Sequence, residues 1–178
     1  MMRRLCSIIK RKEKGFSLIE MAVALAITGA ISGVITMGVF QTMDYSARDS
    51  ARMTAVKQVE NAIHYISRDV QQARTITPAA VPDPDGIDDG FPLQLSWVDW
   101  VGNQYQVTYT IADNELERSY SENAVVTELT VARHIDAGSS DTSCSYNGVF
   151  QLKITATVSG YPAEISETRE IQITPRSG

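Results

Sequence analysis

The sequence has few of the residues from which catalytic and metal-binding sites are usually built. Among 178 residues it holds two cysteines, Cys6 and Cys144, and two histidines, His64 and His134. It contains no Gly-rich phosphate loop and no C-x-x-C, H-E-x-x-H or G-x-S-x-G pattern. The sequence therefore predicts a protein that is not an enzyme and has no cofactor. Both histidines are interpreted as structural or exposed, and Cys144 as a thiol in a Ser-rich loop.

Basic residues are scarce after the first fifteen positions. Residues 1–15 carry six basic side chains and one acidic side chain, a net charge of +5. The other 163 residues carry 10 basic and 20 acidic side chains, a net charge of −10. Because so acidic a body is repelled by polyphosphate, we expect no nucleic-acid partner.

Residues 21–40 have no charged side chain. As an α-helix this run would span about 30 Å, the hydrocarbon thickness of a bilayer. The basic residues that precede it are retained in the cytoplasm by the positive-inside rule. The sequence predicts a single-pass protein of the cytoplasmic (inner) membrane, with its C-terminal head outside the cytoplasm.

Three interpretations of the N-terminus are possible, and Glu20, directly before this run, helps to distinguish them. A secretory signal would have a shorter apolar stretch and a small-residue cleavage site, which the end of this run, GVFQTMDY, lacks. An ordinary signal anchor does not explain Glu20, because a carboxylate in the bilayer costs about 2.5 to 3.5 kcal/mol. A cut between Gly15 and Phe16 would create an amine able to pair with Glu20 of the same chain or of a neighbouring subunit.

The stretch K-G-F-S-L-I-E at residues 14–20, followed by the apolar run, resembles the N-terminal processing and methylation motif of type IV pilins and type II secretion pseudopilins. The resemblance implies that a prepilin peptidase removes the cytoplasmic leader, residues 1–15, by cutting between Gly15 and Phe16. It also implies N-methylation of Phe16 and a role for Glu20 in subunit assembly. The implied partners are the peptidase, other pilin or pseudopilin subunits and an inner-membrane assembly platform.

The membrane segment of the processed chain, residues 16–40, lacks the proline that many major pilins carry there. It contains three glycines instead, Gly29, Gly33 and Gly38, of which the first two form a G-x-x-x-G pattern. These glycines either permit close helix packing in a filament or reflect the general frequency of glycine in membrane helices. Both interpretations remain open at this point.

An apolar stripe predicts that the helix continues through residues 41–77. Its members recur at steps of three and four: Val56, Val59, Ile63, Ile66, Val70 and Ala73. The stripe is too short for a dimeric coiled coil, so we expect it to pack on the chain's own sheet. The whole helix, from residue 16 to about 76, would be about 90 Å long.

Residues 78–92 form a predicted loop rich in Asp, Pro and Gly. Its acidic residues are weak candidates for calcium ligands: Asp83, Asp85, Asp88 and Asp89. Their spacing does not match an EF-hand, and no glutamate closes the loop. The alternative is a solvated cluster of turns.

From residue 93 to 178 apolar and polar residues alternate, which predicts strands. We expect them at residues 93–101, 104–112, 115–120, 125–135, 149–159 and 168–174, with hairpin turns at Gly102 and Asn103 and at Asp113 and Asn114. The predicted fold class is α+β and pilin-like. A long N-terminal α-helix, membrane-embedded in its first half, packs on a C-terminal antiparallel β-sheet.

Taken together, the motif and the pattern predict a structural subunit, a minor pilin or minor pseudopilin of a type IV pilus or a type II secretion filament. Such a filament would be periplasmic or exposed on the cell surface. The alternative is a signal-anchored extracytoplasmic binding module that does not form filaments.

Overall fold

A computed structural model describes residues 15–79, 90–123, 125–138, 140–160 and 163–175. Its helix and strands follow in the order α1 (Leu18–Gln72), β1 (Thr75–Thr77), β2 (Leu93–Val98), β3 (Gln104–Ala112), β4 (Glu115–Glu122), β5 (Val125–Arg133), β6 (Ser143–Tyr146), β7 (Phe150–Val158) and β8 (Ile165–Ile173). The chain comprises two units, Met1–Met43 and Asp44–Gly178, and α1 contributes residues to both. We call the second unit the head.

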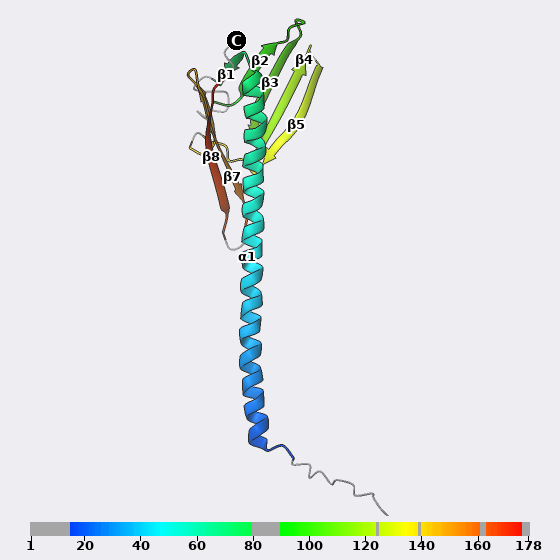
Figure 1. Ribbon diagram of the computed structural model, residues 1–178, viewed down its shortest axis with the longest axis vertical. Helices are drawn as coiled ribbons and strands as arrows, with labels where there is room; N and C mark the ends of the chain where they lie inside the picture. Colours follow the sequence, from blue (N-terminus) through cyan, green and yellow to red (C-terminus); the bar gives the residue numbers. More distant parts are fainter. Residues whose placement is uncertain (1–14, 80–89, 124, 139, 161–162, 176–178) are drawn as a thin grey trace, which may run out of the picture. The chain divides into compact units, whose positions relative to one another are not determined.

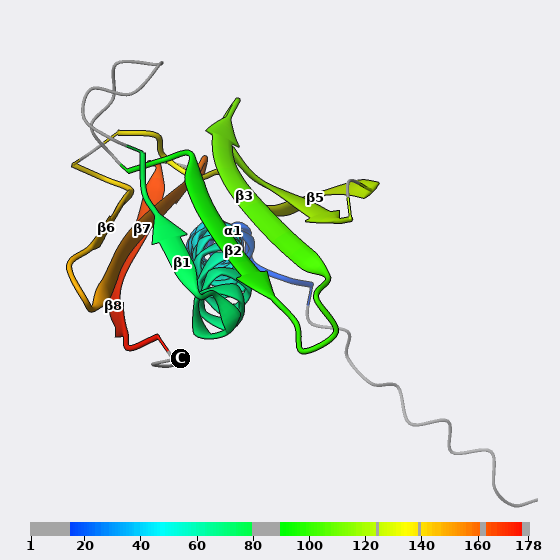
Figure 2. The ribbon, with the colours of Figure 1, turned by 90° about the horizontal axis from the view of Figure 1, so that it is seen from above.

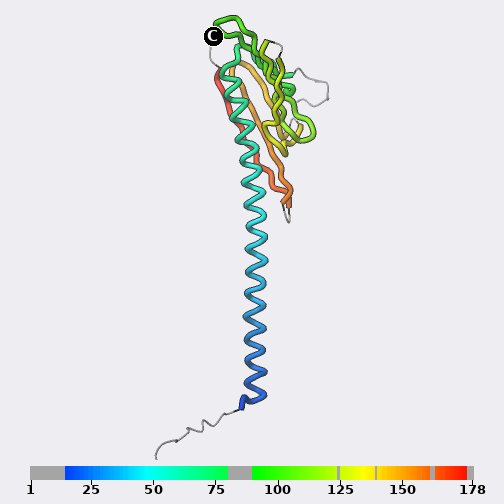
Figure 3. The backbone as a smooth tube through the Cα atoms, turned by 90° about the vertical axis from the view of Figure 1, so that its right-hand side faces the viewer, coloured from blue at the N-terminus to red at the C-terminus, as the bar shows by residue number. Residues whose placement is uncertain are grey.

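In the head, the strands form two antiparallel sheets beside the C-terminal part of α1 (Figures 1 and 3). One sheet has the order β1-β2-β3-β4-β5 and the other the order β6-β7-β8. In the view along the helix, β2 and β3 lie on one side of α1, and β7 and β8 lie on another (Figure 2). The predicted class, a long N-terminal helix packed on antiparallel β-structure, is confirmed. The division into two sheets was not predicted.

The buried face of α1 in the head is built largely from small residues. Its buried members are Ala51, Ala55, Val59, Ala62, Ile66, Asp69 and Val70. Val56 and Ile63, which the sequence pattern placed in the stripe, are only half-buried at its border. Because alanine lets a backbone approach closely, this narrower face allows β-structure to pack on two sides of one helix.

The helix ends earlier than predicted, at Gln72 rather than near residue 76. The Thr-Ile-Thr sequence that follows forms β1, whose Ile76 lies opposite Leu95 of β2. β-branched residues fit a half-buried strand better than a helix. Residues 75–77, which the apolar stripe alone assigns to the helix, therefore belong to the sheet.

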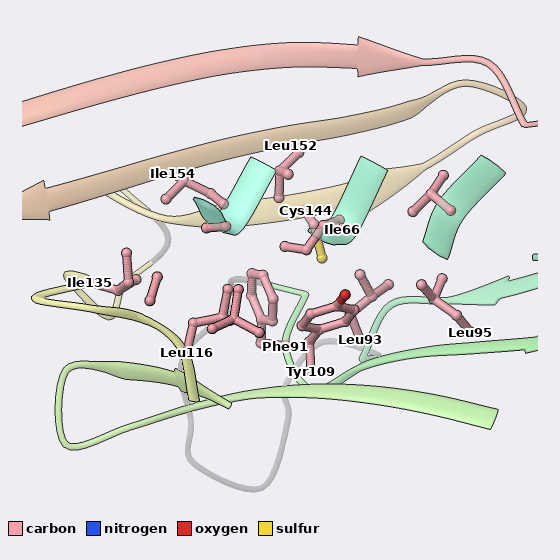
Figure 4. Close-up of a cluster of buried hydrophobic side chains, with 14 of the residues drawn as sticks. Ile66, Phe91, Leu93, Leu95, Tyr109, Leu116, Ile135, Cys144, Leu152 and Ile154 are labelled. Carbon is pink, nitrogen blue, oxygen red and sulfur yellow. The ribbon is translucent and has the colours of Figure 1, made fainter. Parts of the chain in front are cut away.

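The core lies between α1 and the two sheets (Figure 4). Ile66 of α1 is completely buried, with Leu93 and Tyr109 of the five-stranded sheet and Leu152 and Ile154 of the three-stranded sheet in the same cluster. One face of α1 thus packs in the same core as both sheets. Burying such side chains contributes about 1.5 to 3 kcal/mol each.

The two predicted hairpin turns differ in outcome. Asp113 and Asn114 have φ angles of 52° and 60° and join β3 directly to β4, which confirms the two-residue turn. The turn predicted at Gly102 and Asn103 is wrong, because residues 99–103 together connect β2 to β3. The carboxylate of Asp99 accepts hydrogen bonds from the amides of Val101 and Asn103, at 2.9 and 2.8 Å, and so holds a longer loop.

The strand that contains Cys144 was also not predicted. The Ser-rich segment forms β6 rather than a loop, and Cys144 is 7% exposed and lies opposite Leu152 of β7. Its thiol donates a hydrogen bond to the carbonyl oxygen of Gly90, with a sulfur to oxygen distance of 3.2 Å. A serine-rich segment by itself favours a turn, but this one forms a strand because it pairs with the apolar β7.

Candidate functional site

Ser17 and Glu20 cap the N-terminus of α1 through their side chains. The Ser17 amide donates to Oε2 of Glu20 at 3.2 Å, and the Ile19 amide donates to Oγ of Ser17 at 3.4 Å. Ser17 thus acts as the N-cap residue, and the carboxylate of Glu20, three residues later, accepts the N-cap amide as it does in a capping box, so two amides that the helix leaves unpaired are satisfied. Glu20 also places a negative charge in the first turn, where the helix dipole favours it.

The bond between Gly15 and Phe16 lies outside the helix that this cap begins. Both residues are non-helical and exposed, and the Phe16 side chain is 82% exposed. A protease needs an extended, accessible segment, because a helical peptide bond is enclosed by its own hydrogen bonds. Because the cap starts α1 at Leu18, the predicted cleavage bond lies two residues before the helix and is accessible.

From residue 18 to residue 50, every residue of α1 is exposed. This part of the helix is long and apolar enough to cross a membrane, with a mean hydropathy of 2.1 over its most apolar stretch. The Thr28 hydroxyl donates to the Ala24 carbonyl and the Thr36 hydroxyl to the Ser32 carbonyl, both at 2.8 Å. The helix can therefore lie in an apolar environment without leaving these hydroxyl groups unpaired.

The three glycines of this segment lie on open helix surface. A methyl group added at Gly29, Gly33 or Gly38 would meet no atom within 4 Å outside the local helix backbone. None of these positions is therefore required by packing against the described residues of this chain. Their predicted role in helix packing can only involve another molecule and stays a prediction.

Residues 10–36 match the family described as the prokaryotic N-terminal methylation motif. This match is the signature of type IV pilin-like proteins. It covers the cleavage bond, Glu20, Gly29 and Gly33, whereas Gly38 lies just beyond it. The motif implies processing by a prepilin peptidase and assembly with other pilin subunits. Searches of curated proteins and of solved structures found no match to the chain.

The exposed apolar helix near the N-terminus fits the single-pass membrane anchor of a pilin-like protein. The remaining predicted site residues lie elsewhere. The calcium candidates Asp83, Asp85, Asp88 and Asp89 lie outside the described residues. Within the residues that are described, no group of three or more His, Cys, Asp or Glu side chains is placed to hold a metal ion.

The two histidines are both exposed. His64 lies on α1 beside the ring of Tyr65, with ring centroids 5.9 Å apart. His134 follows β5 with a φ angle of 60°, and its carbonyl accepts a hydrogen bond from the Thr157 amide at 2.9 Å. His134 therefore helps to attach the end of β5 to β7 through its backbone.

A buried charged cluster in the head was missed from the sequence. Asp69 is 1% exposed; its Oδ2 accepts hydrogen bonds from the Tyr109 hydroxyl and from Nε of Arg118, both at 2.6 Å. Burial, together with the neighbouring Asp69 carboxylate, raises the pKa of the Tyr109 hydroxyl, which therefore stays protonated and donates. The available signal was the position of Asp69, three residues after Ile66 on the apolar face of the helix.

Proposed function

We propose that this chain is a minor subunit of a type IV pilus or of a type II secretion filament, cut between Gly15 and Phe16 and assembled through α1. Its role is assembly rather than catalysis, and it uses no cofactor. The observation that carries the proposal is the exposed apolar surface of α1 over residues 21–40, which directly follows Glu20 in the first turn of the helix. Exposed apolar surface of this extent requires lipid or protein to cover it.

Glu20 has a physical reason to change partners when the leader is removed. In the described chain, its carboxylate accepts the amide of Ser17. The cut would place a positively charged amine on Phe16, one residue before that amide. A charged amine adds the attraction of opposite charges to the hydrogen bond that a neutral amide can make, so the amine of this or a neighbouring subunit would compete for Glu20. This competition couples cleavage to assembly.

The size of the head supports a minor rather than a major subunit. The described residues of the head form eight strands in two sheets with one shared core, which is more structure than a small repeating subunit needs. Such a head can contribute a specific surface at or near one end of a filament. The pilus and the secretion filament both accommodate this role.

The first test is the mass of the chain extracted from membranes of cells with an active prepilin peptidase. We expect a chain that begins at Phe16 and carries one additional methyl group. A chain that still begins at Met1 in those cells would overturn the proposal.

The second test replaces Glu20 with glutamine, which keeps the shape of the side chain and removes its charge. We expect Glu20→Gln to remain anchored and cut, but to be depleted from the sheared filament fraction. Glu164→Gln, the same change at an exposed position of the head, is the matched control and should be incorporated normally. If the wild-type chain is cut but never enters a filament, a signal-anchored binding module is the better description.

A further inference from the structure

β5 is an edge strand whose outer side is open over most of its length. It pairs with β4 and lies last in the order β1-β2-β3-β4-β5. Figures 1 and 2 both show it at the border of its sheet. At its C-terminal end, the Arg133 amide donates to Oε1 of Gln58 on α1 at 2.8 Å. Among the described residues, no strand pairs with the outer side of β5, which leaves residues 125–130 as an open edge.

The open edge is apolar and exposed on both faces. Val125, Val126 and Leu129 are 70%, 58% and 44% exposed, and every residue from 125 to 130 is exposed. Val125, Thr127 and Leu129 share the face on which Leu116 of β4 enters the core. Val125, Thr127 and Leu129 thus lie on the core-side face of the sheet, but no described part of the chain buries them.

The usual protection of an edge strand is largely missing here. Proteins block such edges with proline, lysine, short strands or bulges, because unpaired amides and carbonyls recruit another strand. β5 has nine residues and no proline, and its register irregularity lies near the covered end, opposite Leu116 and Glu117. Residues 125–130 hold one charged side chain, Glu128.

The charges around this edge select the kind of strand that could add to it. Glu128 lies opposite Ser119, and Glu117 lies opposite Thr130, so both carboxylates are on the outer face of the sheet. In the part of the chain that is described, neither forms an ion pair, whereas the nearby Arg133 pairs with Glu115 at 3.3 Å. An incoming strand with a basic residue beside Glu128 is favoured, and a second copy of this acidic head is disfavoured.

We propose that the open edge of β5, residues 125–130, binds an extended segment of a different protein as an additional strand. Side chains of that segment beside Val125, Thr127 and Leu129 are apolar or β-branched, and one beside Glu128 is lysine or arginine. Backbone hydrogen bonds supply most of the affinity of such a complex, and the alternating side chains supply its specificity. This binding mode is independent of whether the head is carried by a filament or by a single anchor.

The test uses the detergent-solubilised full chain and a fluorescent, end-capped peptide of alternating valine and lysine. We expect saturable binding in fluorescence anisotropy and slower hydrogen exchange of the amides of residues 125–130. The first control is the same peptide with its central amides N-methylated, which keeps the side chains and charge but cannot pair as a strand. Equal binding of this control, or protection only outside β5, would overturn the proposal.

Charge reversal supplies a second, side-chain test. Glu128→Lys should weaken binding of the lysine peptide by about threefold or more and restore it toward a peptide with glutamate in place of lysine. Glu164→Lys makes the same change in net charge away from β5 and should not discriminate between the two peptides. Equal effects of both substitutions would show attraction to the acidic head in general and would overturn the proposal.

Two further measurements distinguish binding at the edge of β5 from binding at Trp100 and from self-association. Among the large apolar side chains in the described part of the head, that of Trp100, in the β2–β3 loop, is the most exposed, at 96%. Trp100→Ala should leave peptide binding unchanged. Self-association that protects residues 125–130 without any peptide would assign the edge to a second copy and overturn the proposal. Because the assay does not depend on cleavage after Gly15, its result is independent of the proposed role in a filament.

Discussion

At the scale of single residues, Asp69 carries the charge on which the contact between α1 and the five-stranded sheet depends. It lies on a helix face made otherwise of alanine, valine and isoleucine, and its side chain is 2% exposed. Two arginines approach it: Arg118, 12% exposed at 2.6 Å, and Arg68, 48% exposed at 3.4 Å. Burial makes the Arg118 pair costly to break, while solvent screens the Arg68 pair.

This difference gives a prediction at one carboxylate. Asp69→Asn should lower the free energy of unfolding by about 3 to 5 kcal/mol, because it leaves Arg118 buried without a counter-charge. Arg68→Gln, which removes only the exposed partner, should cost less than about 1 kcal/mol. Urea unfolding of the full chain in detergent, followed by fluorescence, measures both. Similar losses for the two variants would contradict this account of the cluster.

At the scale of elements, the β3–β4 hairpin depends on two residues with left-handed backbone. Asp113 and Asn114 have positive φ angles, and the register continues directly from Ala112 opposite Glu115 to Tyr105 opposite Glu122. Such a turn matches the twist of the strands that it joins, and asparagine or glycine accommodates it at low cost. The turn therefore sets which residues of β4 face the core.

Asn114→Val should destabilise the head by about 1 to 3 kcal/mol, since a β-branched residue is strained at a φ of 60°. Asn114→Gly should be tolerated at this position. Asn147→Val makes the same substitution at an exposed position outside the positive-φ residues and should change stability by no more than about 0.5 kcal/mol. Urea unfolding and hydrogen exchange of β3 and β4 measure the effects. A tolerated Asn114→Val would show that the strands, not the turn, determine the register.

At the scale of the whole molecule, the two units differ in what they need in order to bury their apolar side chains. The head, Asp44–Gly178, contains the entire buried core described above, whereas α1 from residue 18 to 50 is exposed throughout. The apolar surface of the first unit therefore requires lipid or protein around it, and the head does not require the first unit for its core.

It follows that a chain consisting of residues 44–178 should fold alone. We expect a soluble monomer that unfolds cooperatively in urea, measured by gel filtration and circular dichroism. Ile66→Ala in the same truncated chain should cost about 2 to 5 kcal/mol, because it empties a site between the two sheets. Exposed Asn61→Ala on the same helix is the control and should have little effect. An aggregated or non-cooperative product would show that the head needs the first unit.

Several features could be predicted because they depend on local sequence. The helix needs a long stretch with no proline, the membrane anchor needs twenty uncharged residues, and the turn at Asp113 and Asn114 needs residues that tolerate positive φ. The N-terminal methylation motif, matched over residues 10–36, likewise lies in one continuous stretch of sequence. All of these are properties of neighbouring residues, so they can be recognised before the chain is folded.

Other features depend on residues that are far apart in the chain. β6 exists because Cys144 pairs with Leu152, β1 because Ile76 pairs with Leu95, and the division into two sheets because both pack on α1. Tyr109 and Arg118, the buried partners of Asp69, lie forty and forty-nine residues away in the chain, and the open edge of β5 exists because no strand of the described residues follows β5 in its sheet. Sequence by itself determined the long helix, its apolar first half and the N-terminal methylation motif. Tertiary structure decided what its head exposes, because burial and pairing depend on contacts that no local pattern contains.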